Sequence, residues 1–296
     1  MDERHFTLTC AEGVEVHGTR WAPERPRGVV QVLHGWAEHR RRYRRLAERL
    51  CEAGYAVWAE DHLGHGETGA RGPGLGNLGL RGMEGVVEAI LEVTARLRRE
   101  DPGLPLCLLG HSWGSFLAQR IVRTWGDRYD ALVLTGTTRR PASESRAAPS
   151  PRADGRYDWL TRDEAEVAKY VADPWCGFEK LSPSPHDPRR AYLEEGDDAA
   201  VPGSLPVLIL NGAADPVGGE AGGTRLAAAY QAAGLRDVTL VVYPGARHEL
   251  FNETNRDQVT TDLIRWLDSR ILPLAGGRSE HAGSRRPAAQ LPEPPG

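Results

Sequence analysis

The sequence has no long hydrophobic run. Its longest strand-like stretches are of the size of Val207–Leu210, far below the roughly 18 consecutive apolar residues that a membrane span needs. The first residues, Met1–His5, have no apolar core behind their charges, so we expect no secretion signal. We therefore predict a cytoplasmic protein without a membrane span, for which transient contact with a membrane surface stays open.

A large excess of charge of one sign is also missing. The formal net charge is −4 at pH 7 and the sequence pI is about 6.2. Proteins dedicated to nucleic acids usually carry a basic field over much of their surface, so we expect no nucleic-acid partner. The composition does not predict an oligomeric state.

Cysteine and lysine are scarce. The four cysteines show no Cys-x-x-Cys spacing, and two of them stand in strand-like apolar context, which suits buried thiols in a reducing compartment. They are Cys10, Cys51, Cys107 and Cys176. Two lysines stand against 35 arginines, a bias from which we draw no function.

Short apolar runs alternate with amphipathic helical stretches along most of the chain. Phe6–Cys10 and Val14–Trp21, joined by a turn at Glu12-Gly13, predict an opening hairpin. Further strands are expected at 29–33, 56–59, 106–109, 131–134, 207–210 and 238–242, and helices around 46–51 and at 84–99, 116–123, 223–233 and 256–272. Continuous apolar strands separated by helices predict an α/β fold with a mostly parallel sheet covered on both faces.

Two stretches interrupt this alternation. Residues 138–204 are rich in Pro, Ser, Arg and Asp around one predicted helix, which begins with a capping box at Thr161–Glu164 and ends at Asp173-Pro174. We expect a reduced, partly irregular cap inserted between the two parts of the core, 1–137 and 205–274. The proline-rich end, 275–296, is predicted to be disordered.

The strongest local motif is Gly110–Gly114, with the sequence Gly-His-Ser-Trp-Gly. It fits Gly-x-Ser-x-Gly, the turn between a strand and a helix that exposes a nucleophilic serine. An apolar strand directly precedes the motif and a helical stretch directly follows it. We therefore predict Ser112 as a nucleophile rather than as a residue that only turns the chain.

A serine nucleophile needs a histidine base and an acid that orients it, in the chain order Ser, Asp/Glu, His for this fold. Asp215 and His248 follow two consecutive predicted strands, at the edge where open α/β sheets place their ligands. We predict these two as acid and base. Glu249 is expected to be a loop carboxylate that points away from the serine.

Acyl transfer also needs donors for the developing oxyanion. The backbone amides of Trp36 and Trp113 occupy the two expected places, after the third strand and after the nucleophile. His34 would then hold the loop, since it comes too early in the chain to act as the base.

Other chemistries have weaker support. Asp61, His62 and His65 could imitate a metal site, but they stand on a glycine turn. The run Arg40–Arg45 could bind phosphate, although a solvated helix face is the expected reading. Gly72–Gly82 lacks the Lys and Ser/Thr of a phosphate-binding P-loop. We expect no metal and no cofactor.

Several motifs in the expected order resemble the monoacylglycerol lipase and lysophospholipase branch of the α/β-hydrolases. They are His34–His39, Arg42-Tyr43, Leu46-Ala47, Leu50, Gly54-Tyr55, Asp61–Gly66, the Ser112 motif, Asp215–Val217 and Gly245–Glu249. The resemblance spans about residues 25–135 and 155–270. It implies a Ser-His-Asp esterase or lipase without a cofactor, and its triad is Ser112, His248 and Asp215.

The chain departs from that branch at the mouth of the site. The family usually has a small residue at Trp36, glycine at Ala37, Met at Trp113 and Arg at Leu63, and it places apolar helices in the cap. Residues 138–157 contain no such helix. We therefore expect a shortened lid and a channel suited to short or medium acyl chains.

These observations predict a serine hydrolase of carboxylic esters that forms an acyl-enzyme on Ser112, with monoacylglycerol-like, lysophospholipid-like or smaller acyl substrates. A biosynthetic acyltransferase or thioesterase would use the same triad. A catalytically idle scaffold is the remaining alternative, and the complete triad argues against it.

Overall fold

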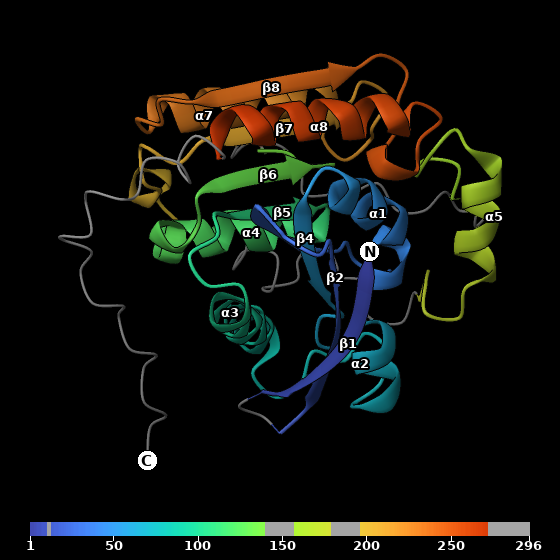
Figure 1. The fold of residues 1–296 in the computed structure, drawn as a ribbon. Helices are drawn as coiled ribbons and strands as arrows, with labels where there is room; N and C mark the ends of the chain where they lie inside the picture. The colour runs from blue at the N-terminus through green and yellow to red at the C-terminus, as the bar shows by residue number, and fades with distance from the viewer. Residues whose placement is uncertain (11–12, 140–156, 179–195, 272–296) are drawn as a thin grey trace.

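Eight strands form one sheet in the computed structural model, which describes residues 1–10, 13–139, 157–178 and 196–271 (Figure 1). The sheet order is β1-β2-β4-β3-β5-β6-β7-β8, and every pair from β4 to β8 is parallel. The strands are β1 (Asp2–Thr9), β2 (Glu15–Ala22), β3 (Gly28–Leu33), β4 (Tyr55–Glu60), β5 (Leu106–His111), β6 (Ala131–Thr135), β7 (Val207–Gly212) and β8 (Val238–Tyr243). The expected α/β architecture is confirmed.

The opening hairpin accounts for the antiparallel part of the sheet. β1 and β2 pair from Asp2↔Ala22 to Thr9↔Glu15, and β2 then pairs antiparallel with β4. Gly13 adopts a φ of 76°, which favours glycine, and its amide donates to the Cys10 carbonyl at 2.8 Å.

Helices cover both faces of the sheet (Figure 1). One apolar layer packs α3 (Gly82–Glu100), α4 (Trp113–Trp125) and α7 (Gly219–Ala232) on the sheet, and the other packs α1 (Arg44–Glu52) and α8 (Arg256–Arg270). In β3, Val29 and Leu33 belong to the first layer, whereas Val30 and Val32 belong to the second. Because both faces are buried, the strand reads as a continuous apolar run.

The cap contributes one described helix, α5 (Glu164–Ala172), which lies at the edge of the molecule beside α1 (Figure 1). The expected capping box at Thr161 is wrong. Asp163 is the N-cap, and its carboxylate accepts from the amides of Ala165 and Glu166, whereas the Thr161 hydroxyl donates to the Asn252 carbonyl at 2.9 Å. Asp163 can cap because its backbone is extended there. The helix ends at Asp173, as predicted.

The remaining helices of the described residues are short. They are α2 (Gly66–Arg71) and the 3-10 helices η1 (Arg40–Tyr43), η2 (Gly126–Arg128), η3 (Asp198–Ala200) and η4 (Leu250–Asn252). In these ranges, no helix combines the length and the apolar character that crossing a bilayer requires. The predictions for the cap's polar segments within 140–156 and 179–195, and for the end 275–296, lie outside the described residues.

Candidate active site

Ser112 stands on a strained turn between β5 and α4. Its φ of 52° and ψ of −119° are rarely adopted by residues other than glycine. The flanking glycines make room for this turn. A Cβ on Gly110 would lie 2.4 Å from the Gly114 carbonyl oxygen, and one on Gly114 would lie 2.2 Å from the carbonyl oxygen of Leu33. The geometry is that of the predicted nucleophile turn.

His248 and Asp215 meet beyond the carboxyl ends of β8 and β7. The His248 Nδ1 donates to the Asp215 Oδ1 at 3.0 Å, and both side chains are buried. The same carboxylate oxygen accepts from the Val217 amide at 2.8 Å, which fixes its orientation. This bond leaves the His248 Nε2 free to exchange a proton with a nucleophile.

The two groups change each other's pKa. Burial alone would lower the pKa of His248 and raise that of Asp215. The opposite charge and the shared hydrogen bond outweigh burial in both, so the pKa of His248 is raised above its ordinary value and that of Asp215 is lowered. The pair therefore holds an ionised carboxylate against a strengthened base.

A cavity of about 140 Å³ has both Ser112 and His248 in its wall. The described part of the cap supplies much of the remaining wall, through Tyr157, Trp159 and Phe178. The Trp159 ring centroid lies 5.0 Å from that of His248. The predicted nucleophile Ser112, the predicted base His248 and an apolar surface thus face one space.

The loop after β3 lies against the nucleophile turn. A Cβ on Gly35 would be 3.2 Å from the Ser112 Cβ, and the rings of Trp36 and Trp113 meet edge to face at 5.0 Å. Among the described residues, neither the Trp36 amide nor the Trp113 amide has a hydrogen-bond acceptor. Trp36 also lines the cavity that holds Ser112, and an oxyanion hole requires amides without an internal acceptor at such a place.

The His34 side chain holds this loop in place through two hydrogen bonds. Its Nε2 accepts from the His62 amide at 3.0 Å and its Nδ1 donates to the Gly35 carbonyl at 2.8 Å. Burial lowers its pKa well below the ordinary value, so the ring is neutral. This placement agrees with the structural role that the sequence indicated.

The residues of the alternative metal site pack into the core beside the Ser112 turn, where both ring nitrogens of His62 and the Nε2 of His65 have no hydrogen-bond partner among the described residues. The Asp61 carboxylate accepts from the Arg40 amide at 2.8 Å and pairs with the Arg40 guanidinium. The His65 ring stacks on Trp113 at 4.9 Å, and burial lowers its pKa to about 3. The rings of His62 and His34 lie 4.0 Å apart. The cluster is packing behind the nucleophile turn.

A different trio, His39, Asp173 and Cys176, has donor atoms within 4.8 Å of one another in the described part of the chain. Both Asp173 oxygens are already bonded, one to His39 Nε2 and the other to the Trp175 amide, each at 2.8 Å. Burial raises the pKa of the Cys176 thiol far above its ordinary value, so the thiol stays protonated. We interpret these three residues as a structural contact between the core, through His39, and the cap, through Asp173 and Cys176.

The expectation of a solvated arginine face is wrong for two residues of the Arg40–Arg45 run. Arg40 is 1% exposed, and its Nη2 donates to Glu67 at 2.8 Å. Arg42 donates to both oxygens of Glu249 at 2.6 Å and to Glu38 at 2.7 Å. These pairs form because η1 turns the side chains of Arg40 and Arg42 inward, where burial requires a partner.

Glu38 and Glu249 were not predicted as parts of the site. The Glu38 carboxylate accepts from the Gly35 amide at 2.5 Å and from the Tyr43 hydroxyl at 2.8 Å. Arg42 outweighs burial and holds the pKa of Glu249 at about 2. Because Arg42 bonds to both Glu38 and Glu249, it links the loop after β3 to the loop that carries His248. The spacing of Glu38 and Arg42, four residues apart, is the one sequence signal for this network.

Comparisons with known proteins match most of the chain. A family model described as serine aminopeptidase, S33, matches residues 24–255. The monoacylglycerol lipase of Mycolicibacterium smegmatis is 32% identical over 280 residues, which cover 88% of this chain and 95% of the relative. The human monoglyceride lipase is 26% identical, over 89% of this chain and 90% of its own.

Solved structures place the fold in the same group. A thermostable carboxyl esterase from Bacillus coagulans, in complex with glycerol, has a TM-score of 0.79 and 28% sequence identity, covering 92% of this chain and 99% of the esterase. The resemblance noted in the sequence is thereby confirmed. The chain belongs to the serine aminopeptidase S33 family of α/β-hydrolases, within which it is similar to monoacylglycerol lipases.

Proposed function

We propose that the protein hydrolyses carboxylic esters through an acyl-enzyme on Ser112. The observation that carries this proposal is the buried Asp215–His248 hydrogen bond, whose imidazole faces the same cavity as the strained Ser112. His248 acts as the general base and acid, and Asp215 holds its tautomer and stabilises the imidazolium. The Trp36 and Trp113 amides bind the oxyanion.

The reaction proceeds in two halves. The Ser112 oxygen attacks the ester carbonyl while the His248 Nε2 takes the hydroxyl proton. The tetrahedral intermediate then breaks its bond to the alkoxy oxygen, which leaves as an alcohol with that proton. Water, deprotonated by the same imidazole, attacks the acyl carbonyl. The bond between the acyl carbon and the Ser112 oxygen then breaks, the serine oxygen takes the proton from His248, and the acid leaves.

Monoacylglycerols or smaller acyl esters are the substrates that we propose. Two relatives are named for monoacylglycerol or monoglyceride hydrolysis and a structural neighbour is a carboxyl esterase. The cavity of about 140 Å³ is small beside the ~300–1,000 Å³ of sites for drug-sized ligands, which favours a short acyl group.

Alanine variants of the triad test the assignment. Ser112→Ala and His248→Ala should each remove most turnover of p-nitrophenyl butyrate, and Asp215→Ala should be the mildest of the three, since the residues act as a unit. Near-full activity of Asp215→Ala would contradict the assigned acid. Fluorophosphonate labelling that persists in Ser112→Ala would contradict the nucleophile.

A separate measurement decides whether water or another molecule accepts the acyl group. A purified enzyme that releases acid from a monoacylglycerol or a p-nitrophenyl ester in buffer supports hydrolysis. Turnover confined to acyl-CoA, or transfer to an added alcohol in preference to water, would support the thioesterase or acyltransferase alternative. Absence of both labelling and turnover would support an idle scaffold.

A further inference from the structure

The loop that carries the Trp36 amide holds a strained residue. Ala37 adopts a φ of 55°, and Ser112 is the only other non-glycine residue with a positive φ in the described ranges. A Cβ disfavours this left-handed conformation, so an alanine keeps it only where its surroundings hold the backbone in place. Other groups must therefore hold the backbone of Ala37.

The described part of the cap supplies them. The Tyr170 hydroxyl donates to the Ala37 carbonyl at 2.9 Å, and the Gly177 amide donates to the same oxygen at 3.0 Å. Burial raises the pKa of Tyr170 well above its ordinary value, so this hydroxyl remains a donor wherever ester hydrolysis is measured. Both donors come from residues 157–178, far from Ala37 in the sequence.

The other side of the loop is held by the core. The Gly35 amide donates to Glu38 at 2.5 Å. The Gly35 carbonyl, which shares a peptide plane with the Trp36 amide, accepts from His34 Nδ1 at 2.8 Å, and on the other side of Trp36 the cap holds the Ala37 carbonyl. Since the Trp36 amide itself has no acceptor among the described residues, its direction depends on the His34 bond to Gly35 on one side and on the cap's bonds to Ala37 on the other.

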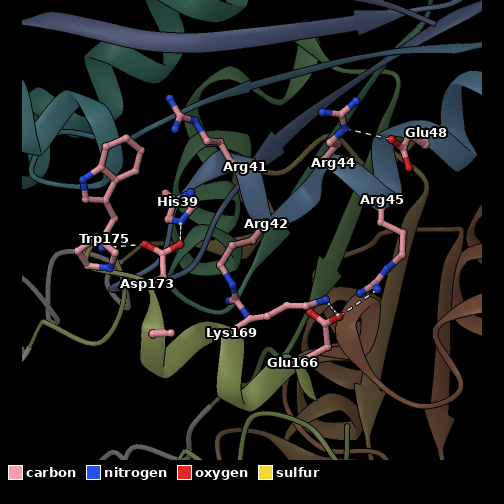
Figure 2. A pocket seen from close by; sticks show the side chains of 12 residues that line it. His39, Arg41, Arg42, Arg44, Arg45, Glu48, Glu166, Lys169, Asp173 and Trp175 are labelled. Carbon is pink, nitrogen blue, oxygen red and sulfur yellow. Dashed lines mark hydrogen bonds and ion pairs between the residues drawn. The ribbon is translucent and has the colours of Figure 1, made fainter. Parts of the chain in front are cut away.

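The cap segment is itself fastened to η1 and α1. Asp173 accepts from His39 at 2.8 Å, and the Arg42 guanidinium lies over the Tyr170 ring at 4.8 Å. Arg45 of α1 pairs with Glu166 of α5 at 3.1 Å across the groove of about 780 Å³ between the two helices, and Lys169 pairs with the same Glu166 oxygen from within α5 (Figure 2). These contacts fix α5, and hence the Tyr170 hydroxyl, relative to the loop.

We propose that Tyr170 is a positioning residue that, together with His34, sets the direction of the Trp36 amide, because Tyr170 holds the Ala37 carbonyl on the cap side of the loop. The inference rests on the proposed ester hydrolysis and extends it, because it makes the cap a part of the oxyanion hole rather than only a cover. The reaction then depends on the cap being docked, even for substrates too small to touch it.

Tyr170→Phe tests the proposal, because it keeps the ring beneath Arg42 and removes only the hydroxyl. With p-nitrophenyl butyrate we expect kcat to fall about tenfold while KM stays within about twofold, a part of the ~100–1,000-fold that loss of an oxyanion donor costs. The inhibition constant of butaneboronic acid, which mimics the tetrahedral intermediate, should rise by the same factor as kcat falls.

Rescue separates positioning from substrate contact. Ala37→Gly adopts a positive φ readily, so in the Tyr170→Phe background it should restore a part of the lost kcat. Tyr230→Phe is the matched control, since it removes a buried tyrosine hydroxyl that has no partner in the described structure and lies in the α7 layer. This control should leave kcat unchanged.

Three outcomes would overturn the proposal while the proposed hydrolysis stands: a loss confined to KM, a loss that Ala37→Gly does not restore, or a Tyr170→Phe variant as active as Tyr230→Phe. A wild-type protein that neither hydrolyses the ester nor reacts with a fluorophosphonate would instead overturn the proposed function.

Discussion

At the scale of single residues, burial and charge oppose each other in the site. His248 is 2% exposed and Asp215 is 5% exposed, so each would resist ionisation alone. Facing each other at 3.0 Å, they reverse that tendency, and the pKa of the imidazole rises. In the free enzyme His248 therefore holds a proton to a higher pH than an ordinary histidine.

This gives a prediction for the pH dependence. Only neutral His248 can accept the serine proton, so kcat/KM should fall as the pH drops, with a midpoint above the ordinary value of 6.5. Asp215→Asn removes the charge that raises this pKa, so its midpoint should move to lower pH and its kcat should fall. A pH profile of kcat/KM measures both, and a midpoint that the substitution leaves unchanged would contradict the assigned pair.

A second prediction at this scale concerns Arg42. Arg42→Met would leave Glu38 and Glu249 buried without their cation, and breaking such a buried pair costs about 3–5 kcal/mol of unfolding free energy. Arg44→Met is the matched control, because Arg44 is exposed and solvent screens its pairs with Glu3 and Glu48, so its loss should be much smaller. Urea unfolding measures both losses, and equal losses would show that the Arg42 network does not stabilise the fold.

The residues that we propose for the chemistry could be picked from the sequence where they follow strands. Ser112, Asp215 and His248 come after apolar runs, and parallel strands bring their carboxyl ends to one edge. Arg42 and Tyr170 carry no such signal, since their partners Glu249 and Ala37 lie 207 and 133 positions away in the sequence. Contacts of that separation exist only in the folded chain.

At the scale of elements, the strands were predicted better than the short helices. A strand buried on both faces needs an apolar run, which the sequence displays directly. The helix α2 has two glycines among its six residues and no apolar periodicity, so nothing in its sequence predicts it. The N-cap of α5 was misplaced because Thr161 and Asp163 are both good caps, and the tertiary bond of Thr161 to Asn252 decides between them.

The cap gives a prediction about acyl length. The described cap residues line a cavity of about 140 Å³, and Trp36 adds bulk to its wall. Each CH₂ removed from water contributes about 0.8 kcal/mol of binding free energy, so kcat/KM rises with chain length only while the chain is covered. We expect the rise to stop at short or medium length in a series of p-nitrophenyl esters, each kept below its micelle concentration. A steady rise through long chains would show a covered tunnel.

At the scale of the whole molecule, the sheet and the two helix layers serve to bring distant loops together. The Trp36, Ser112, Asp215 and His248 segments follow β3, β5, β7 and β8, which are all parallel, so these segments leave the sheet at the same edge. The described cap residues then close this edge from the side of α1 (Figure 1). The alternation of elements predicted this architecture, whereas the docking of the cap could not be predicted because it rests on polar contacts between separate segments.

The central claim is that a covalent acyl group forms on Ser112, and trapping that group is the most direct test. We predict that acid quenching of the enzyme during turnover of p-nitrophenyl butyrate leaves one butyryl group on the protein, that peptide mapping places it on Ser112, and that Ser112→Ala shows none. Turnover by a protein that carries no acyl group at any quench time, or an acyl group that maps to a residue other than Ser112, would contradict the account.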